Sequence, residues 1–252
     1  MLRDAARRYL ADDFALRRSG NNMAQNASWH GYAELGWLAL MAPEEAGGLG
    51  GDIADVLVLT EEMGRALSPQ PYIWSAILAT GLVELAASDT ARLELMASIA
   101  SGERRISPAL YEPGRRYRME PETRATKSPM GYRLSGEKCL VLGGGDADVL
   151  IVSARLEGNS IALFTIPADH AGVFRTRYET IDDGDAMDVR FEQVALGDDA
   201  LLAITSAEAI DDVIDKARLA LCADALGALQ GAVEMTAEYL KTRTQFGQPL
   251  AN

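Results

Sequence analysis

The feature that most constrains this sequence is a hydrophobic period that changes twice along the chain. Apolar residues first recur every three or four positions, then the period falls towards two, and near the end it is helical again. Doubly wound and TIM-barrel folds alternate strands with helices, so this order excludes both. We predict an α+β multidomain protein with an N-terminal helical bundle in 1–104, a central antiparallel β sandwich or barrel in 105–204, and the start of a C-terminal helical bundle in 205–252.

Several residues of the first region favour helix ends. Asp52 is placed to cap one helix, and Pro71 to lie in the first turn of the next. Asp89 is placed to cap the last helix of the region, and Gly102 to close it.

The central region contains short runs of alternating or apolar residues that predict strands. Glycine-containing turns separate them, and no helical crossover lies between them, so we expect the sheet to be antiparallel. The predicted strands cover 132–134, 139–142, 149–154, 161–166 and 189–194.

The last region predicts one long helix over 206–243, because its apolar residues repeat every three or four positions. Thr205 and Glu208 have capping-box spacing at its start, and at about 1.5 Å per residue the helix would run to roughly 55 Å. The apolar stripe consists of Ile210, Ile214, Ala217, Leu221, Ala225, Leu229, Ala232, Met235 and Tyr239.

This stripe is expected to pack against other parts of the protein, because most helical stability comes from tertiary packing. Exposing nine apolar positions forfeits on the order of 10 kcal/mol, comparable to the stability of a whole domain. We therefore expect the helix to pack against the first bundle and against helices of a missing C-terminal segment or another chain. Leu221, Leu229 and Met235 should then be buried in a stable assembly.

Composition narrows the class of protein. A net charge of −13 would repel a phosphate backbone, which argues against nucleic acid as a partner. No run of eighteen apolar residues and no export signal is present, so we expect a cytoplasmic protein without a membrane span. Cys139 and Cys222 form no CxxC pattern and suit a reducing compartment. His30 and His170 lack metal-ligand spacing, so we expect no metal.

Three segments carry a resemblance to a known family. Residues 239–250 read Tyr-Leu-Lys-Thr-Arg-Thr-Gln-Phe-Gly-Gln-Pro-Leu and match an Arg-x-Gln-Phe-Gly-x-Pro motif that follows a long helix. Together with an N-terminal segment, at 34–50 and 61–67, and with a central segment at 136–155, they follow the family's order and resemble FAD-dependent acyl-CoA dehydrogenases whose C-terminal helical domain is largely missing here. Residues 110–118 and 220–227 are similar to the small subunits of pimeloyl-CoA dehydrogenase, which pair with a large subunit.

The resemblance implies FAD as cofactor and assigns roles to matched positions. Arg243, Gln245 and Phe246 would contact FAD bound mainly by a neighbouring subunit, with Arg243 near the pyrophosphate. Alternatively, Arg243 and Lys241 are helix-end cations that offset the dipole. The other expected flavin positions are Leu110 and Tyr111, through their backbone groups, together with Leu140 and Leu142.

Asp215 and Arg218 match an element that would line the acyl-CoA site. The alternative is an i, i+3 surface ion pair, worth only a few tenths of a kcal/mol. Ala217 occupies the position where one branch of the family places a catalytic Glu. The usual base lies nearer the end of the family's C-terminal domain, so we expect it beyond Asn252 and no catalytic residue in this chain.

The sequence also departs from the family. Leu140, Val141 and Leu142 replace the usual Trp-Ile-Thr, so an aromatic wall and a hydroxyl near the flavin edge are lost. Tyr117 replaces a Ser over the pyrophosphate. Three arginines around it would supply charge instead, or would form a solvated basic turn: Arg115, Arg116 and Arg118.

The resemblance implies α,β-dehydrogenation of an acyl-CoA to the 2,3-enoyl-CoA. An alternative function is a non-catalytic partner subunit that contributes part of a flavin site, and a third is an α+β scaffold without flavin. The expected partners are acyl-CoA, an electron-transfer flavoprotein or similar acceptor, and further subunits in a homo- or hetero-oligomer, either a dimer or a tetramer.

Overall fold

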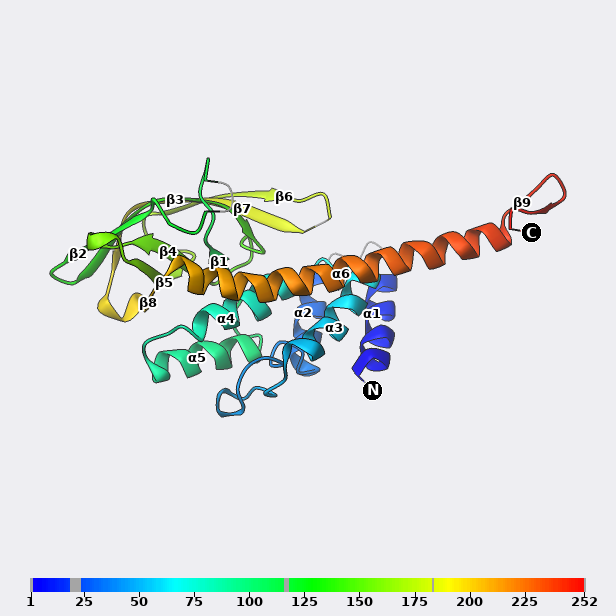
Figure 1. Cartoon of the computed structure of the whole chain (residues 1–252), viewed down its shortest axis with the longest axis horizontal. Helices are drawn as coiled ribbons and strands as arrows, with labels where there is room; N and C mark the ends of the chain where they lie inside the picture. The colour runs from blue at the N-terminus through cyan, green and yellow to red at the C-terminus, as the bar shows by residue number, and fades with distance from the viewer. Residues whose placement is uncertain (1, 19–23, 116–117, 183, 252) are drawn as a thin grey trace. The chain divides into compact units, whose positions relative to one another are not determined.

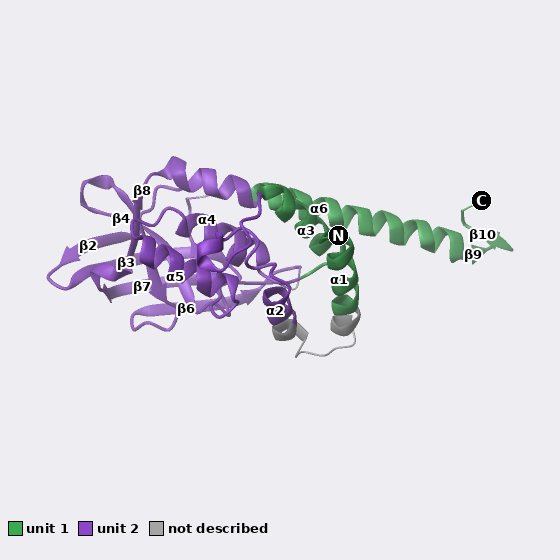
Figure 2. Cartoon of the chain, turned by 90° about the horizontal axis from the view of Figure 1, so that it is seen from below, with its two compact units in different colours: residues 1–24, 53–68, 218–252 green, residues 25–52, 69–217 purple. Residues whose placement is uncertain are grey.

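The computed structural model describes residues 2–18, 24–115, 118–182 and 184–251. The chain forms two compact units (Figure 2). Unit 1 comprises Met1–Ala24, Ile53–Ser68 and Arg218–Asn252, and unit 2 comprises Gln25–Asp52 and Pro69–Ala217. The predicted domain boundaries follow secondary-structure content, whereas the two units are defined by contacts between residues. The boundaries stay a prediction.

The first hundred residues are helical, as predicted, and Figure 1 shows these elements in blue to green. The elements are α1 (Leu2–Arg18), α2 (Ala24–Glu34), the 3-10 helix η1 (Glu44–Ala46), α3 (Ile53–Arg65), the π-helix η2 (Ile73–Leu78), α4 (Ala79–Val83) and α5 (Asp89–Ala100).

The predicted helix ends are partly correct. Asp52 directly precedes α3, and Ser75 N donates to Pro71 O as η2 begins. The cap of α5 is Ser88 rather than Asp89, because the Ser88 hydroxyl accepts from Ala91 N at 3.3 Å and Asp89 is already helical. Gly102 has φ +70 just after α5, a conformation that favours glycine.

No α-helix lies between the described strands of the β region, and these strands form one eight-stranded sheet. The strands run in the order β6-β7-β3-β2-β4-β5-β8, and β1 pairs with β4. Their bounds are β1 (Ile106–Ala109), β2 (Arg124–Ser128), β3 (Gly131–Leu142), β4 (Val149–Arg155), β5 (Ile161–Pro167), β6 (Val173–Glu179), β7 (Asp185–Leu196) and β8 (Leu201–Thr205).

The sheet differs from the prediction in two respects. Most neighbouring strands are antiparallel as expected, but β1 and β2 pair parallel with β4. A parallel pair needs a long connection, and here β2 and β3 supply it for β1 and β4. Sequence reasoning also missed β1, β2, β6 and β8, which are short or, in β2 and β6, mostly polar and exposed.

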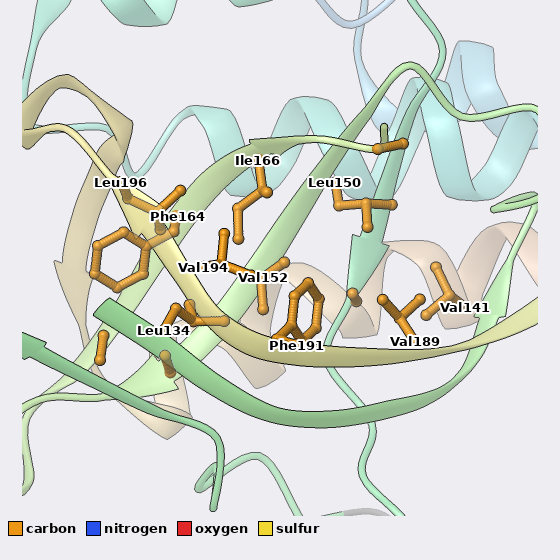
Figure 3. Packing of buried hydrophobic residues seen from close by; sticks show 14 of the residues in the cluster. Leu134, Val141, Leu150, Val152, Phe164, Ile166, Val189, Phe191, Val194 and Leu196 are labelled. Atoms are coloured by element: carbon orange, nitrogen blue, oxygen red, sulfur yellow. The ribbon is translucent and has the colours of Figure 1, made fainter. Parts of the chain in front are cut away.

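One apolar core joins both ends of the sheet. Side chains from β3 and β7 meet side chains from β4 and β5, as Figure 3 shows for Leu134, Phe191, Val152 and Phe164. The ring of Tyr132 packs edge-on against Phe164 at 5.1 Å between centroids. The sheet therefore bends round its own core, as the predicted sandwich or barrel requires.

Unit 1 is held by ion pairs between α1 and α3. The Glu62 carboxylate is almost fully buried and accepts hydrogen bonds from Arg3 at 2.9 Å and from Arg7 at 2.7 and 2.8 Å. Burial would raise the pKa of Glu62, but the bonds from Arg7 and Arg3 outweigh it and lower the pKa overall. Glu61 accepts a bidentate pair from the same Arg3 guanidinium.

The long helix α6 (Ala207–Thr242) matches the predicted range. Its cap is Ser206, whose hydroxyl accepts from Ala209 N at 3.2 Å. The predicted cap, Thr205, is wrong because this residue ends β8 and pairs with Ile161 of β5.

The face of α6 that meets α3 within unit 1 is not the predicted apolar stripe. A Cβ on Gly64 would clash with the Asp224 carbonyl, and one on Gly227 with the Glu61 carbonyl. Glycines therefore bring the two helix backbones together on this face.

The distal part of the stripe faces solvent in the single chain. Leu221, Leu229 and Met235 are 37%, 65% and 67% exposed, whereas Ile210 and Ile214, nearer the start of α6, are buried. The expectation that a further segment or chain covers the exposed residues stays a prediction.

Gly227→Ala tests the close contact between α3 and α6. Alanine gains about 1 kcal/mol of helix propensity over glycine, but its methyl group would force the backbones apart. We expect a net loss of about 1–3 kcal/mol in the free energy of unfolding, measured by urea denaturation. Gly231→Ala is the matched control on the same helix. Its Cβ would lie 3.1 Å from Arg65 O, which a small shift relieves, so this variant should lose less stability than Gly227→Ala. A Gly227→Ala protein more stable than wild type would disprove the contact.

Candidate functional site

Four of the predicted flavin positions lie together in unit 2. Cys139 N donates to Tyr111 O at 2.9 Å, which places 110–111 beside the second half of β3. Leu140 follows on the same strand, and Leu142 ends it. The structure therefore brings the two segments into contact, although they are about thirty residues apart in sequence.

β3 is irregular at this point. Its register with β7 shifts between Lys138 and Val141, and Leu140 has φ +52, which is rare for a residue other than glycine. Its side chain is 47% exposed. Bulges in edge or irregular strands re-aim side chains, and here the bulge turns Leu140 out of the core.

Asp188 of β7 holds the bulge in place. Its Oδ1 accepts from Leu140 N at 3.1 Å and from the Tyr178 hydroxyl at 3.0 Å. Burial and the bond to this carboxylate both raise the pKa of Tyr178. The phenol therefore stays protonated as a donor, and one carboxylate oxygen links β3, β6 and β7.

A buried ion pair lies next to the bulge. Lys138 Nζ donates to Glu112 Oε1 at 2.8 Å, to Ser153 Oγ at 2.9 Å and to Leu110 O at 3.3 Å. The Lys138 residue is 1% exposed, and burial lowers its pKa to about 8 against the attraction of Glu112. Burial would raise the pKa of Glu112, but the Lys138 charge and its hydrogen bonds lower it overall.

Three arginines of unit 2 border a cavity of about 490 Å³. Arg115 pairs with Glu122 at 2.7 Å, and Arg155 Nε donates to Pro121 O at 2.9 Å. Two of the sequence-predicted positions, Arg116 and Tyr117, lie outside the described residues. The cavity is lined by Arg115, Arg118, Met119, Glu120, Arg155, Ala207 and Asp211.

The Arg-x-Gln-Phe-Gly-x-Pro motif forms a β-hairpin in unit 1. Strands β9 (Thr244–Gln245) and β10 (Gln248–Pro249) pair antiparallel around Phe246 and Gly247, which have φ +52 and +82. Positive φ at both central residues is typical of a type I′ turn. Leu250 N closes the hairpin on Arg243 O at 2.9 Å.

The hairpin presents its predicted flavin residues outward. The side chain of Phe246 is fully exposed, and Arg243 and Gln245 are exposed as well. Within the described residues, no side chain forms a hydrogen bond or ion pair with the Arg243 guanidinium. By contrast, Lys241 pairs with Glu238 at 2.7 Å on the last turn of α6.

The predicted substrate residues both lie on α6. Asp215 belongs to the part of the helix in unit 2 and Arg218 to the part in unit 1, and both are exposed. Ala217 between them is buried. Their proposed contact with acyl-CoA stays a prediction.

Sequence reasoning missed Glu112, Lys138, Asp188 and Tyr178. One signal was present for Lys138, because it shares the inward parity of Leu134 along β3, where a charged residue needs a partner. The partner itself comes from a segment without regular structure, so the strand pattern alone does not identify it.

Two features are absent from the described residues. No helix there is both long and apolar enough to cross a bilayer. No group of three or more His, Cys, Asp or Glu side chains is arranged to hold a metal ion in the same part of the chain.

Asp188→Ala tests the support of the bulge. The Leu140 amide loses its acceptor, so we expect its hydrogen exchange to become about tenfold faster, equivalent to roughly 1–1.5 kcal/mol. Asp188→Asn keeps an acceptor oxygen and should lose much less protection. Glu192→Ala, an exposed carboxylate on the same strand, is the control. Equal exchange in the Ala and Asn variants, measured by NMR, would contradict this role for Asp188.

Comparison with known proteins places the chain in a family. Residues 1–103 match the model of the acyl-CoA dehydrogenase N-terminal domain, and 207–252 match that of the acyl-CoA dehydrogenase C-terminal domain. Acyl-CoA dehydrogenase FadE28 of Mycobacterium tuberculosis is 32% identical over 91% of this chain. The chain spans between 55% and 64% of the length of three curated relatives, FadE28 among them.

Solved structures agree with the sequence comparison. The Tcur3481-Tcur3483 steroid ACAD variant is 31% identical with a TM-score of 0.83, and the match covers all of this chain and 68% of that one. An acyl-CoA dehydrogenase complexed with FAD from Bacillus anthracis is 25% identical with a TM-score of 0.88, over all of this chain and 46% of that one. The family models match both ends of the chain, and the solved structures match its fold. The chain therefore belongs to the acyl-CoA dehydrogenase family.

Proposed function

We propose that this chain is a subunit of an FAD-dependent acyl-CoA dehydrogenase that takes part in converting an acyl-CoA to the 2,3-enoyl-CoA. The observation that carries the proposal is the contact between 110–111 and the bulge at Leu140. The resemblance to the family implies that both segments lie beside the flavin, and the fold brings them together.

The residues at this place fit a flavin ring. An isoalloxazine has a flat apolar face and a polar edge, and ligand sites pair apolar walls with a few placed polar groups. Leu140 supplies an exposed apolar side chain, and the backbone of Leu110 and Tyr111 lies beside it. Left-handed backbone held by Asp188 is the kind of local strain that clusters at ligand sites.

The C-terminal hairpin fits a second contact with the cofactor. A guanidinium binds a diphosphate through a rigid fork of donors, and an aromatic ring such as Phe246 adds apolar area. The hairpin fixes the backbone of Arg243 and Phe246 at the end of α6, while both side chains are exposed. We propose that Arg243, Gln245 and Phe246 reach FAD held mainly by a neighbouring subunit.

FAD would accept the hydride from the β-carbon, which is the chemistry that the cofactor supplies. The chain's own residues would position the ring and exclude water from its edge. Asp215 and Arg218 are proposed to line the acyl-CoA site. The base is proposed to come from outside 1–252, because buried Ala217 offers no carboxylate.

The second candidate is a non-catalytic partner subunit that completes a flavin site in a heteromer. Leu142 has no hydroxyl to place at the flavin edge, which favours this role. A similar solved protein is named by two components, Tcur3481-Tcur3483. The resemblance to small subunits of pimeloyl-CoA dehydrogenase points the same way and stays a prediction.

The remaining partners follow from the same proposal. We propose an electron-transfer flavoprotein or similar acceptor for the reduced flavin, a homo- or hetero-oligomer, and a cytoplasmic location.

Arg243→Ala should release flavin from the oligomer, because the only guanidinium of the hairpin motif would be lost. We expect at least a tenfold weaker affinity, equivalent to about 1.4 kcal/mol, measured as flavin absorbance after gel filtration. Lys241→Ala is the matched control, since it removes a cation from the same helix end and should retain flavin. If both variants lose flavin equally, the two residues act as helix-end cations. Full flavin in Arg243→Ala, or in a monomer, would overturn the proposal.

Residues 1–252 alone should not oxidise any acyl-CoA. Neither Ala217 nor another recognised base position of this stretch carries a carboxylate, so the α-proton has no acceptor. The assay uses the FAD-loaded 252-residue chain with an artificial electron acceptor and acyl-CoAs of several lengths. Turnover above the rate of free FAD would refute the expectation.

A further inference from the structure

The buried pair of Glu112 and Lys138 connects the segment 110–112 to β3 and β4. We propose that it is a positioning pair for the flavin, and that tight flavin binding requires the ammonium form of Lys138. This inference rests on the proposed function, since it assumes that the backbone of Leu110 and Tyr111 lies beside the flavin ring.

The number of N–H donors on Lys138 Nζ equals the number of acceptors around it. An ammonium has three N–H donors, and three acceptors lie within reach. They are Glu112 Oε1 at 2.8 Å, Ser153 Oγ at 2.9 Å and Leu110 O at 3.3 Å. A neutral amine keeps two donors and gains a lone pair to which the Ser153 hydroxyl can donate, so loss of the proton removes the charge rather than a contact. The bond to the Leu110 carbonyl, the longest of the three at 3.3 Å, is then no longer charge-assisted and holds the carbonyl less strongly.

The peptide bond between Leu110 and Tyr111 fixes the directions of its two polar groups relative to each other. The Leu110 carbonyl and the Tyr111 N–H belong to one planar trans peptide, so they point in opposite directions. Holding the carbonyl on Lys138 therefore fixes the direction of the Tyr111 N–H. On the other side of the same residue, Tyr111 O accepts from Cys139 N at 2.9 Å. Both peptide planes of Tyr111 are thus oriented by β3.

Glu112 anchors the pair from the other end. Its Oε1 also accepts from Thr123 N at 2.9 Å, and its Oε2 accepts from Glu122 N at 2.6 Å. The carboxylate cannot move towards solvent without losing these two bonds. The ammonium is therefore held at a fixed point between the loop and the sheet.

Several elements pack around Lys138, and their charged groups act on its ammonium. The segment 110–115 presents Glu112, which favours the ammonium, and Arg115, which disfavours it. β3 presents the Cys139 thiol, and β4 presents only the neutral Ser153 hydroxyl. On β7 the residue opposite Lys138 is Val189.

Burial dominates, so the pKa of Lys138 is lowered to about 8, and the ammonium is lost above this pH in the folded protein. Flavin affinity should then fall between pH 7 and 9. Stability changes in the opposite direction. An unfolded lysine keeps its proton to about pH 10.4, so this residue contributes increasing stability as the pH rises from about 8 towards 10.4. A lysine with a purely structural role would give the change in stability without the change in flavin affinity.

The experiment measures the FAD dissociation constant of the oligomeric full chain from pH 6.5 to 9.5 by flavin fluorescence. For wild type we expect a rise of about tenfold between pH 7 and 9, because only about a tenth of the molecules then hold the ammonium. Lys138→Met should bind at least tenfold more weakly at pH 7 and show no step near pH 8. The exposed Lys127, paired with Asp198, provides the control Lys127→Met, which should follow wild type.

A second variant distinguishes a loss of flavin binding from a loss of folding. Lys138→Met leaves the Glu112 charge buried alone, whereas Glu112→Gln combined with Lys138→Met removes both charges and keeps an acceptor for the loop. This double variant should fold, bind FAD weakly and also lack the step. Either variant showing the wild-type affinity and pH profile would overturn the inference.

Hydrogen exchange of the Tyr111 amide, measured without flavin, separates this inference from the proposed function. We expect faster exchange in the double variant than in wild type, since the peptide plane is no longer held. Unchanged exchange would overturn the positioning role. Failure of wild type to bind FAD, with altered exchange at Tyr111, would instead refute the proposed flavin function and leave the positioning of the loop established.

Discussion

The site depends on one ammonium group, the Nζ of Lys138, which is bonded from three segments of unit 2. A charge in an apolar core is tolerated only when it is paired and fully hydrogen-bonded, and Glu112 and Ser153 meet this condition. The same ammonium group donates to the carbonyl of Leu110 and so fixes the orientation of this peptide, which lies in a segment without regular structure. The position of 110–111 beside β3 follows from this interaction and from the Cys139 to Tyr111 bond.

The same region shows why a bulge is needed. Lys138 must point into the core to meet Glu112, whereas Leu140 is exposed two residues later. In a regular strand, residues i and i+2 share a face, so both conditions cannot hold without an irregularity. The shift between Lys138 and Val141, together with the positive φ of Leu140, resolves the conflict. Asp188 then stabilises the irregular backbone from β7.

The hairpin at the end of α6 uses local chemistry instead. Gly247 accepts positive φ without strain, whereas Phe246 has φ +52, which is rare for a residue other than glycine and is not the residue that a type I′ turn prefers. Phe246 and Arg243 are exposed in the described part of the chain, which suits contact with a cofactor or a neighbouring subunit. Family membership and this exposure together support the proposed oligomeric flavin site.

The sequence by itself determined the order of helical and strand regions, the extent of α6 and the location of the family motifs. These depend on hydrophobic period and turn chemistry, which act over a few residues. Tertiary structure decided the parallel pairing of β1 with β4, the glycine contact between α3 and α6, and the pairing of Glu112 with Lys138. Thr205 illustrates the difference, since its capping potential is local but its place in β8 is set by pairing with β5. Long-range contacts choose among locally acceptable states, and no short window of sequence contains both partners.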